Sequence, residues 1–336
     1  MFYKELKILL RKNSLKRTLN ILQLLSSYFV SRILKKAIHW GQPMSISIEP
    51  TTACNLHCPE CPSGLRSFTR PTGNLRFEQF AKFVDPITTR LSSIVFYFQG
   101  EPYINNDLFK MIHHVSQRNV YTMSSTNGHF LSVENCIKTI QSGLDRLVIS
   151  IDGTTQDTYE QYRIGGNLEL VIEGTKNLVA AKKEMNSTTP LIVFQFLVVK
   201  PNEHQIEDVK KLAKDLEVDH LEFKTAQIYN YHNGSDLIPE AEIFSRYKKQ
   251  SNGTYSIKNK LLNHCWRMWQ GCVITWDGRV VPCCFDKDAQ HNLGQISNQT
   301  LRDVWRNKSY QDFRSKIILG RKNIDICTNC TEGSLV

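Results

Sequence analysis

The sequence predicts an α/β fold in which short strands and longer helices alternate around a parallel sheet. Between about residues 43 and 225, β-rich apolar runs alternate with segments of helical periodicity, which is the pattern of repeated βα units. Polar turns that contain glycine follow successive predicted strands. With 336 residues and 41% apolar composition, the chain can bury a sizeable core, so we expect one large domain and one smaller unit.

The first predicted element is a basic, amphipathic helical extension, residues 1–42. It holds nine Lys or Arg residues and one acidic residue, Glu5, and so carries +8 of the formal charge of +10. Its uncharged run from Thr18 to Ser31 spans 14 residues, fewer than the roughly 20 that a membrane-spanning helix needs. Three interpretations stay open: a structural helix packed on the body, a basic helix on an anionic membrane surface, or an Arg-rich transit peptide.

The rest of the chain carries only about +2. This small charge excludes a basic body wrapped around a polyanion, so no nucleic-acid partner is expected. No small-residue cleavage site follows the apolar run, so residues 1–42 do not resemble a secretory signal. We therefore expect a cytoplasmic protein, with peripheral membrane contact through residues 1–42 left open.

The alternating elements are assigned to residues 43–235. The predicted strands are Ser45–Glu49, Ile94–Phe98, Tyr121–Ser124, Arg146–Ile151, Leu191–Val199 and His220–Phe223. Helices predicted between them include Phe77–Phe83, Leu108–Gln117, Val133–Ser142, Leu168–Met185 and Ile206–Leu216. The short runs are rich in β-branched and aromatic residues, whereas the longer ones repeat their apolar residues at helical spacing.

A polar, turn-rich segment from Tyr229 to Tyr255 indicates a domain boundary. A Cys-rich unit, residues 256–336, follows it. The elements predicted in this unit are a hairpin of Val273–Trp276 and Arg279–Val281, turned by Asp277-Gly278, and helices Thr300–Arg306 and Tyr310–Ile317.

Polar turns follow four successive strands of the predicted sheet. They are the loop that holds Cys54, Cys58 and Cys61, then Gln99-Gly100-Glu101-Pro102, then Ser125-Thr126-Asn127-Gly128, then Ser150-Ile151-Asp152-Gly153. Because loops at the carboxyl ends of parallel barrel strands converge on one mouth, these turns predict a single cofactor pocket.

The spacing of the first three cysteines indicates a metal cluster. Nothing marks the chain as exported, so its ten cysteines are better explained as metal or redox ligands than as disulfides. Thiolates of Cys54, Cys58 and Cys61 can hold three corners of a [4Fe–4S] cluster and leave one iron open to a small molecule. A structural zinc ion, the alternative, normally takes four protein ligands.

With this loop the chain resembles the radical S-adenosylmethionine superfamily, whose hallmark is a C-x3-C-x2-C loop after the first strand. The resemblance covers about residues 45–225 and implies a partial (β/α)6 TIM-like barrel. In this family the open iron chelates the amino and carboxylate groups of S-adenosylmethionine. An electron from the cluster then breaks a sulfur–carbon bond, giving methionine and a 5′-deoxyadenosyl radical that abstracts hydrogen from the substrate.

The resemblance also implies a set of cofactor-binding residues. They are Gln99, Gly100, Glu101 and Pro102 for the methionyl ammonium, Ser150 and Asp152 near the methionyl and ribose groups, Arg163 for the carboxylate, and Asn127 for the adenosyl portion. The chain departs from the family pattern at two positions. Gln99 replaces the first glycine of the Gly-Gly-Glu-Pro motif, and Glu60 stands where an aromatic residue often lies near the adenine.

The C-terminal cysteines resemble the SPASM/twitch extension of the same superfamily, which binds auxiliary iron–sulfur clusters. The resemblance implies one auxiliary cluster held by Cys265, Cys283, Cys327 and Cys330. Cys272 or Cys284 is an alternative ligand, and a zinc ribbon is an alternative site. Cys136 stands alone and is expected to be a buried apolar residue.

The function that follows is a radical enzyme acting on an unidentified peptide, alcohol or lipid-linked precursor. Its implied partners are the substrate and a reductant such as flavodoxin or ferredoxin. Weak candidates for substrate contact follow the fifth and sixth strands: Lys200, Asn202, Glu203, His204, Lys224 and Gln227. The competing hypothesis is a non-catalytic, metal-stabilised binding module with a basic arm for nucleic acid or membrane.

Overall fold

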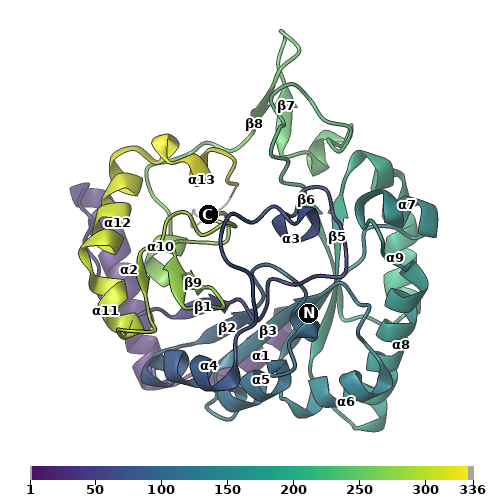
Figure 1. Cartoon of the computed structure of the whole chain (residues 1–336), viewed down its shortest axis with the longest axis horizontal. Coiled ribbons are helices and arrows are strands. Elements are labelled where there is room, and N and C mark those ends of the chain that lie inside the picture. The colour runs from purple at the N-terminus through teal and green to yellow at the C-terminus, as the bar shows by residue number, and fades with distance from the viewer. Residues whose placement is uncertain (1, 332–336) are drawn as a thin grey trace.

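The computed structural model describes residues 2–331 and confirms the predicted α/β fold (Figure 1). Within these residues the strands form one nine-stranded sheet, in the order β11-β10-β9-β1-β2-β3-β4-β5-β6, and a small sheet of β7 and β8. Strands β1 to β6 pair in parallel in chain order. The large sheet ends openly at β11 and β6, so it is a partial barrel.

The barrel strands begin and end within two residues of their predicted limits. They are β1 Ser45–Ile48, β2 Ser93–Phe96, β3 Tyr121–Thr126, β4 Arg146–Ser150, β5 Leu191–Val198 and β6 His220–Thr225. The helices outside the sheet are α4 Phe77–Val84, α5 Leu108–Ser116, α6 Val133–Gln141, α7 Gln156–Tyr162, α8 Leu168–Glu184 and α9 Ile206–Asp215 (Figure 1). Side-chain caps fix some starts, as where Ser132 Oγ accepts from the backbone N–H of Asn135.

The C-terminal unit continues the barrel sheet. Strand β9, Gly271–Ile274, pairs in parallel with β1, and β10, Arg279–Val281, returns antiparallel to it. The predicted hairpin is therefore confirmed, with its first strand beginning two residues early. A Cβ on Gly271 would lie 1.8 Å from the carbonyl oxygen of Ser45, so only glycine lets β9 approach β1 at this point. The remaining elements are α10 Arg267–Gln270, β11 Gly294–Gln295, α11 Leu301–Arg306, α12 Lys308–Gly320 and α13 Asp325–Thr328.

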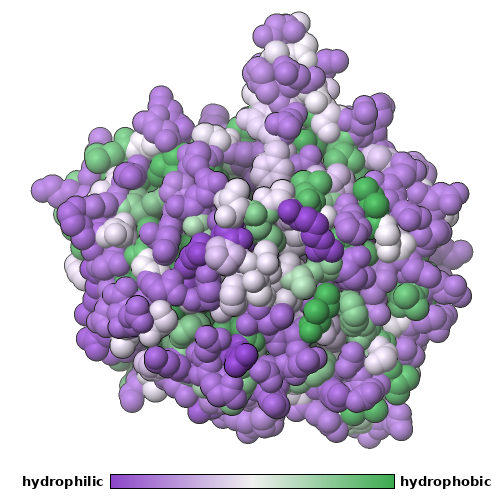
Figure 2. Space-filling model, viewed as in Figure 1, coloured by the Kyte–Doolittle hydropathy of each residue, from purple (hydrophilic) through white to green (hydrophobic). Residues whose placement is uncertain are grey.

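The segment predicted to hold only turns contains a strand. Strand β7, Tyr247–Lys249, pairs antiparallel with β8, Tyr255–Ile257, and this hairpin projects at the top of Figure 1. The ring of Tyr231 stacks on Tyr247 with centroids 4.4 Å apart. Figure 2 shows that the projection is mainly hydrophilic. Its short polar strands gave no alternating pattern from which the hairpin could be predicted.

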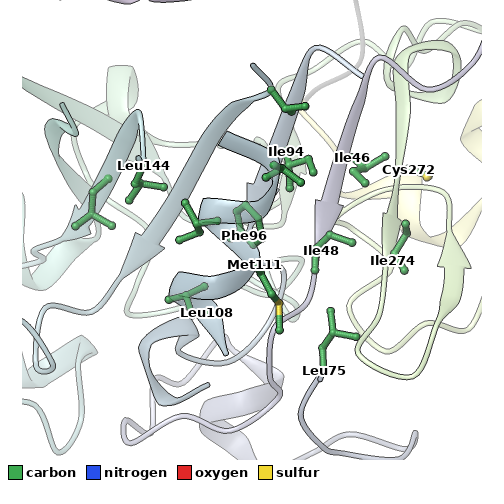
Figure 3. Close-up of a cluster of buried hydrophobic side chains, with 14 of the residues drawn as sticks. Ile46, Ile48, Leu75, Ile94, Phe96, Leu108, Met111, Leu144, Cys272 and Ile274 are labelled. Carbon is green, nitrogen blue, oxygen red and sulfur yellow. The ribbon is translucent and has the colours of Figure 1, made fainter. Parts of the chain in front are cut away.

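The barrel core lies between the sheet and the outer helices. Figure 3 shows Ile46, Ile94 and Phe96 of adjacent strands facing Met111 of α5. These side chains are at most 1% exposed. Because helices cover this face of the sheet, the side chains that point toward them are apolar and buried, whereas the alternate residues of β1, Ser45 and Ser47, point to the other face and are half-buried.

The N-terminal extension forms two helices, α1 Phe2–Lys12 and α2 Leu15–Leu34, which lie behind the strands in Figure 1. We call this pair the floor. The buried ammonium of Lys12 lies 2.5 Å from the carboxylate of Asp145, just before β4. Asn20 bonds to the backbone of Gln42 and Arg90, before β1 and β2. The floor therefore packs against the amino ends of the strands, which is the structural interpretation of residues 1–42. Among residues 2–331, no helix has the length and hydropathy to cross a membrane.

Candidate active site

The first cysteine loop follows β1 and is held closely by its own backbone. The backbone N–H of Cys61 donates to the carbonyl of Cys58 at 3.3 Å, and that of His57 donates to Ile164 at 3.0 Å. A Cβ on Gly64 would lie 2.5 Å from the backbone nitrogen of Cys58. This close turn places all three thiols along a cavity of about 170 Å³ at the barrel mouth.

Each of the three thiols has a polar neighbour outside the cysteine loop: Gln99 and Asn127 lie in two of the predicted turns, and Arg163 lies at the end of α7. The contacts, each 3.9 Å long, are Asn127 Nδ2 to Cys54 Sγ, Arg163 Nη1 to Cys58 Sγ, and Cys61 Sγ to Gln99 Oε1. Burial raises the pKa of Cys54 to about 11 in the absence of a metal. A cationic cluster would reverse this effect, because metal binding favours thiolate.

The predicted site residues lie together around this cavity. Those that line it are Gly100, Glu101, Pro102, Asn127, Ser150 and Arg163. Gln99 and Asp152 lie behind them and reach the site through Cys61 and Arg163. The predicted convergence of four strand ends is therefore what the structure shows.

Gly100 adopts a backbone conformation that its surroundings demand. Its φ is +75° and a Cβ would lie 2.4 Å from the carbonyl oxygen of Thr51. Its N–H donates to Ser63 Oγ at 2.9 Å, and the N–H of Glu101 donates to Ala53 at 2.7 Å. The turn after β2 is thus bonded to the cysteine loop, which only glycine permits at this position.

The Glu101 side chain is occupied in joining two turns. Its oxygens accept hydrogen bonds from the backbone of Tyr103 and Asn127 and from the hydroxyl of Thr126, at 2.7 to 3.2 Å. Full burial nevertheless raises the pKa of Glu101 to about 7. Any contact of this carboxyl group with a bound amine would therefore depend on pH.

Asp152 and Arg163 form a buried ion pair. Arg163 Nε lies 2.5 Å from Asp152 Oδ2, while Asp152 Oδ1 accepts from the backbone of Leu197 at 2.7 Å. The pKa of Asp152 is raised by burial, and that of Arg163 is raised by the neighbouring carboxylate and thiol against the effect of its own burial. Asp152 therefore orients Arg163, which leaves Nη1 directed at Cys58.

Several polar side chains after the fifth strand bond to other parts of the protein. Asn202 is fully buried and donates to the carbonyls of Asp152 and Leu197. Glu203 accepts from the backbone of Ala241, and Lys200 pairs with Glu240 on the surface. These bonds remove the polar groups of Asn202 from any role in binding substrate directly, contrary to expectation. His204 and Lys224 are exposed and Gln227 is half-buried.

The structure adds residues that sequence reasoning missed. Ser63, Tyr97, Phe98 and Tyr162 also line the cavity. Tyr97 and Phe98 lie just beyond β2, next to the predicted turn, so their place near the strand end was the available signal.

Glu60, one of the two departures from the family pattern, has a clear structural role. Its Oε2 accepts from the backbone of Tyr229 at 2.9 Å. Nearby, the ammonium of Lys287 lies 4.8 Å from the Tyr229 ring and 3.5 Å from the Glu60 carbonyl. Burial lowers the pKa of Lys287, whereas Cys61 and Cys284 raise it. Lys287 therefore lies between the first cysteine loop and the C-terminal cysteine segment that holds Cys284.

Three of the four predicted auxiliary ligands gather around Arg321, and the fourth, Cys283, lies near two of them. Arg321 Nη2 donates to Cys330 Sγ at 3.2 Å, and the thiols of Cys265, Cys327 and Cys330 all raise the pKa of this arginine. Burial and the nearby thiols Cys284, Cys265 and Cys327 raise the pKa of Cys283. Three segments far apart in the sequence thus bring four sulfur atoms to one region.

The two alternative ligands, Cys272 and Cys284, border one small cavity together with Cys283. Cys272 lies on β9 beside Ile46 and Ile274 in the apolar core (Figure 3). Cys284 influences the pKa of Tyr97, which lines the cavity. Cys136 is fully buried in the core, as expected of an apolar residue. Cys265 and Cys327 belong to the same buried core cluster as Cys272, so burial does not distinguish Cys272 from Cys283 as the partner of Cys265.

Comparison with known proteins identifies the family. A model of the radical SAM superfamily matches residues 48–217, and a model of the SPASM iron–sulfur cluster-binding domain matches residues 265–331. The chain is 25% identical to the tungsten-containing aldehyde ferredoxin oxidoreductase cofactor-modifying protein of Pyrococcus furiosus, over 84% of this chain and 86% of that protein. It is 24% identical to the AdoMet-dependent heme synthase of Methanosarcina barkeri, over 79% and 82%.

Among solved structures, Streptococcus suis SuiB bound to S-adenosylmethionine has the same fold, with a TM-score of 0.59 and 13% identity, over 87% of this chain and 73% of that one. The family match excludes the non-catalytic zinc module considered above. The chain belongs to the radical S-adenosylmethionine superfamily: it is an enzyme with a SPASM domain, and its cofactors are a [4Fe–4S] cluster, an auxiliary iron–sulfur cluster and S-adenosylmethionine.

Proposed function

We propose that this enzyme cleaves S-adenosylmethionine reductively at a cluster held by Cys54, Cys58 and Cys61, and abstracts hydrogen from a substrate that enters the barrel mouth. One observation carries the proposal: three thiols border one cavity, and each contacts a polar group from a different segment outside the cysteine loop. This donor set fits a cluster with one open iron, because three protein ligands leave its fourth corner free.

When bound, the cluster supplies the electron that breaks a sulfur–carbon bond of S-adenosylmethionine and so yields the hydrogen-abstracting radical. The chain's own residues bind and orient that molecule. We assign its carboxylate to Arg163, because Asp152 holds this guanidinium beside Cys58. The turn of Gln99, Gly100, Glu101 and Pro102 would receive the ammonium, and Ser150 and Asn127 would contact the remainder.

The auxiliary cluster is assigned to Cys265, Cys283, Cys327 and Cys330. The choice is supported by the interaction of Cys265, Cys327 and Cys330 with Arg321 and by that of Cys283 with Cys265 and Cys327. Four thiols would satisfy every iron, so this cluster would relay electrons or tune the site and would not bind substrate directly. Arginine N–H groups near cluster sulfurs are expected to raise its reduction potential.

Three functional regions follow from these assignments. Residues 43–235 would bind S-adenosylmethionine, residues 256–336 would bind the auxiliary cluster, and residues 1–42 would close the amino ends of the strands. The model matches at residues 48–217 and 265–331 agree with this division. A flavodoxin or ferredoxin would supply the electrons.

The polar interior of the barrel supports a substrate with hydrogen-bonding groups. The charges of Arg146, Glu222 and Arg267 all act on the buried Tyr97. Arg146 and Glu222 pair across β4 and β6. The named relatives modify a cofactor or make heme, and SuiB binds a precursor peptide. A peptide, an alcohol and a lipid-linked precursor are the substrate classes to screen.

The test is anaerobic reconstitution with iron and sulfide, followed by iron counting and an assay for 5′-deoxyadenosine with strong reductant. About eight irons per chain and formation of 5′-deoxyadenosine are expected. A variant in which Cys54, Cys58 and Cys61 are all replaced by Ala should retain about four irons and form no 5′-deoxyadenosine. Cleavage by that variant would disprove the assignment of the site.

A further inference from the structure

The second floor helix, α2, has its polar and apolar faces reversed relative to an ordinary surface helix. The side chains it buries are Arg17, Asn20, Leu24, Ser27, Tyr28 and Ser31. Its exposed face carries a row of apolar side chains, which we call the floor stripe: Leu15, Leu19, Leu22, Phe29 and Ile33. A helix packed on a protein core normally directs such a row inward.

Hydrogen bonds fix this orientation. Arg17, which is 4% exposed, donates to the carbonyls of Asn119 and Thr88 at 2.6 and 3.1 Å. Asn20 exchanges two hydrogen bonds with the backbone of Gln42, at 2.9 and 2.8 Å. Turning α2 to bury the floor stripe would leave these buried polar groups without partners, at a large cost in free energy.

Helix α1 extends the exposed apolar surface. Tyr3, Leu6, Leu9 and Leu10 are all exposed, while Glu5 on the inner side accepts from the hydroxyl of Tyr121 and pairs with Arg146. Beside α1, a cavity of about 630 Å³ is lined in part by Lys7 and Arg11. Both floor helices therefore combine an internally bonded face with an outer apolar face.

The charges around this surface identify what would cover it. The exposed cations of the floor are Lys4, which pairs with Asp219, and Lys7, Arg11, Lys16 and Arg32; Lys35 and Lys36 follow directly after α2. The only acidic residue in 1–42 is Glu5, which is engaged with Arg146. A second copy packed on the floor stripe, in either direction, would bring these like charges together, which is unfavourable. An anionic surface would attract them.

We propose that the outer face of α1 and α2 docks on an anionic lipid bilayer, with the floor stripe in the interfacial region and the cations at the phosphate groups. Apolar side chains combined with basic ones are what interfacial helices need. The cysteines lie at the carboxyl ends of the strands and the floor at their amino ends. The active-site mouth would thus open away from the membrane.

The test is flotation of the reconstituted full-length protein with vesicles of phosphatidylcholine alone or with about one third phosphatidylglycerol. The protein should float with the anionic vesicles at low salt, and less at high salt. Leu19→Glu with Leu22→Glu should abolish flotation. The matched control is Leu170→Glu, since Leu170 on α8 is 50% exposed, as Leu19 and Leu22 are 52% and 53% exposed.

A charge variant distinguishes attraction to anionic lipid from nonspecific apolar adsorption. Lys35→Gln with Lys36→Gln should weaken binding to anionic vesicles about thirtyfold, whereas Lys211→Gln with Lys214→Gln on α9 should not change it. Formation of 5′-deoxyadenosine should persist in every variant, because none touches the mouth.

Three results would overturn the proposal. They are no flotation of the parent protein with anionic vesicles, equal flotation of the Leu19→Glu, Leu22→Glu variant, or a dimer in solution that this variant dissociates. The last result would assign the floor stripe to a second copy. Because vesicle binding needs no iron, these outcomes are independent of whether the proposed active-site assignment holds.

Discussion

The two cysteine regions contain the same ligand type in opposite settings. Cys54, Cys58 and Cys61 come from one short loop and border an open cavity. Cys265, Cys327 and Cys330 are each no more than 7% exposed and, with Cys283, come from separate segments. The first region leaves room for another molecule, while three of the four thiols in the second region are buried around Arg321 and Cys283 is half-buried.

This difference indicates a division of labour. Three thiols beside a cavity suit bond-breaking chemistry at an open iron, whereas four thiol ligands, which leave no iron open, suit electron transfer or stabilisation. The electrostatic surroundings differ too: the first set contacts Gln99, Asn127 and Arg163 from three different segments, whereas three thiols of the second set act on one arginine, Arg321. Variants in each region should therefore fail in different ways.

The largest effect is expected from Cys58→Ala. The open cluster has only three proposed ligands, so losing one should remove it, with iron falling from about eight to about four per chain. Formation of 5′-deoxyadenosine should fall to background. Cys136→Ala, in the core away from both sets, serves as the control and should keep all its iron. If Cys58→Ala still cleaved S-adenosylmethionine, the proposed difference between the two cysteine regions would be wrong.

The second expected effect is a loss of about half the iron in Cys327→Ala, with cofactor cleavage still detectable. Because this cysteine belongs to the second region, product formation from a true substrate and thermal stability should fall more than cleavage itself. Cys272→Ala is the matched control. It should keep its iron and lose about 1 kcal/mol of stability from a small core cavity. If Cys272→Ala lost iron instead, Cys272 on β9 would be a ligand of the auxiliary cluster.

A third effect concerns Arg163 in the open region. Arg163→Gln should destabilise the protein by about 3–5 kcal/mol, because Asp152 would be a buried charge without its partner. Urea unfolding of the metal-free protein measures this loss. Adding Asp152→Asn should recover part of it, and the Km for S-adenosylmethionine should stay raised in both variants. If Arg163→Gln were as stable as the parent protein and had the same Km, the ion pair would neither stabilise the fold nor bind S-adenosylmethionine.

The smallest effect is a pH dependence from Glu101. Its raised pKa means that the folded protein holds this proton more tightly than the unfolded chain. The resulting stabilisation is complete below the ordinary value of 4.5 and is lost as pH rises through about 7. The loss is about 3 kcal/mol. The free energy of unfolding of Glu101→Gln, measured with urea at pH 5 and pH 8, should lack this pH-dependent contribution. An identical pH profile in the two proteins would contradict the expectation.

Local sequence was sufficient for most of the barrel and for the open site. The strands and helices follow from apolar periodicity within each segment, and the cysteine spacing lies within one loop. Gly100, Glu101, Asn127 and Ser150 could be placed together because parallel strand ends must converge on one edge, whereas Arg163 was added through the resemblance to the superfamily. What could not be predicted is which polar groups bind each other, as with Asn202, whose side chain bonds to Asp152 and Leu197.

The sequence by itself determined the order of βα units, the three-cysteine loop and the basic character of residues 1–42. Only the tertiary structure decided that β9 joins β1 in the same sheet, that Cys272 is buried in the core, and that the floor stripe faces outward. These outcomes depend on contacts such as that of the Tyr28 hydroxyl with His264, 236 residues away. Periodicity reveals that a helix has two faces, but only the groups packed against it determine which face is buried.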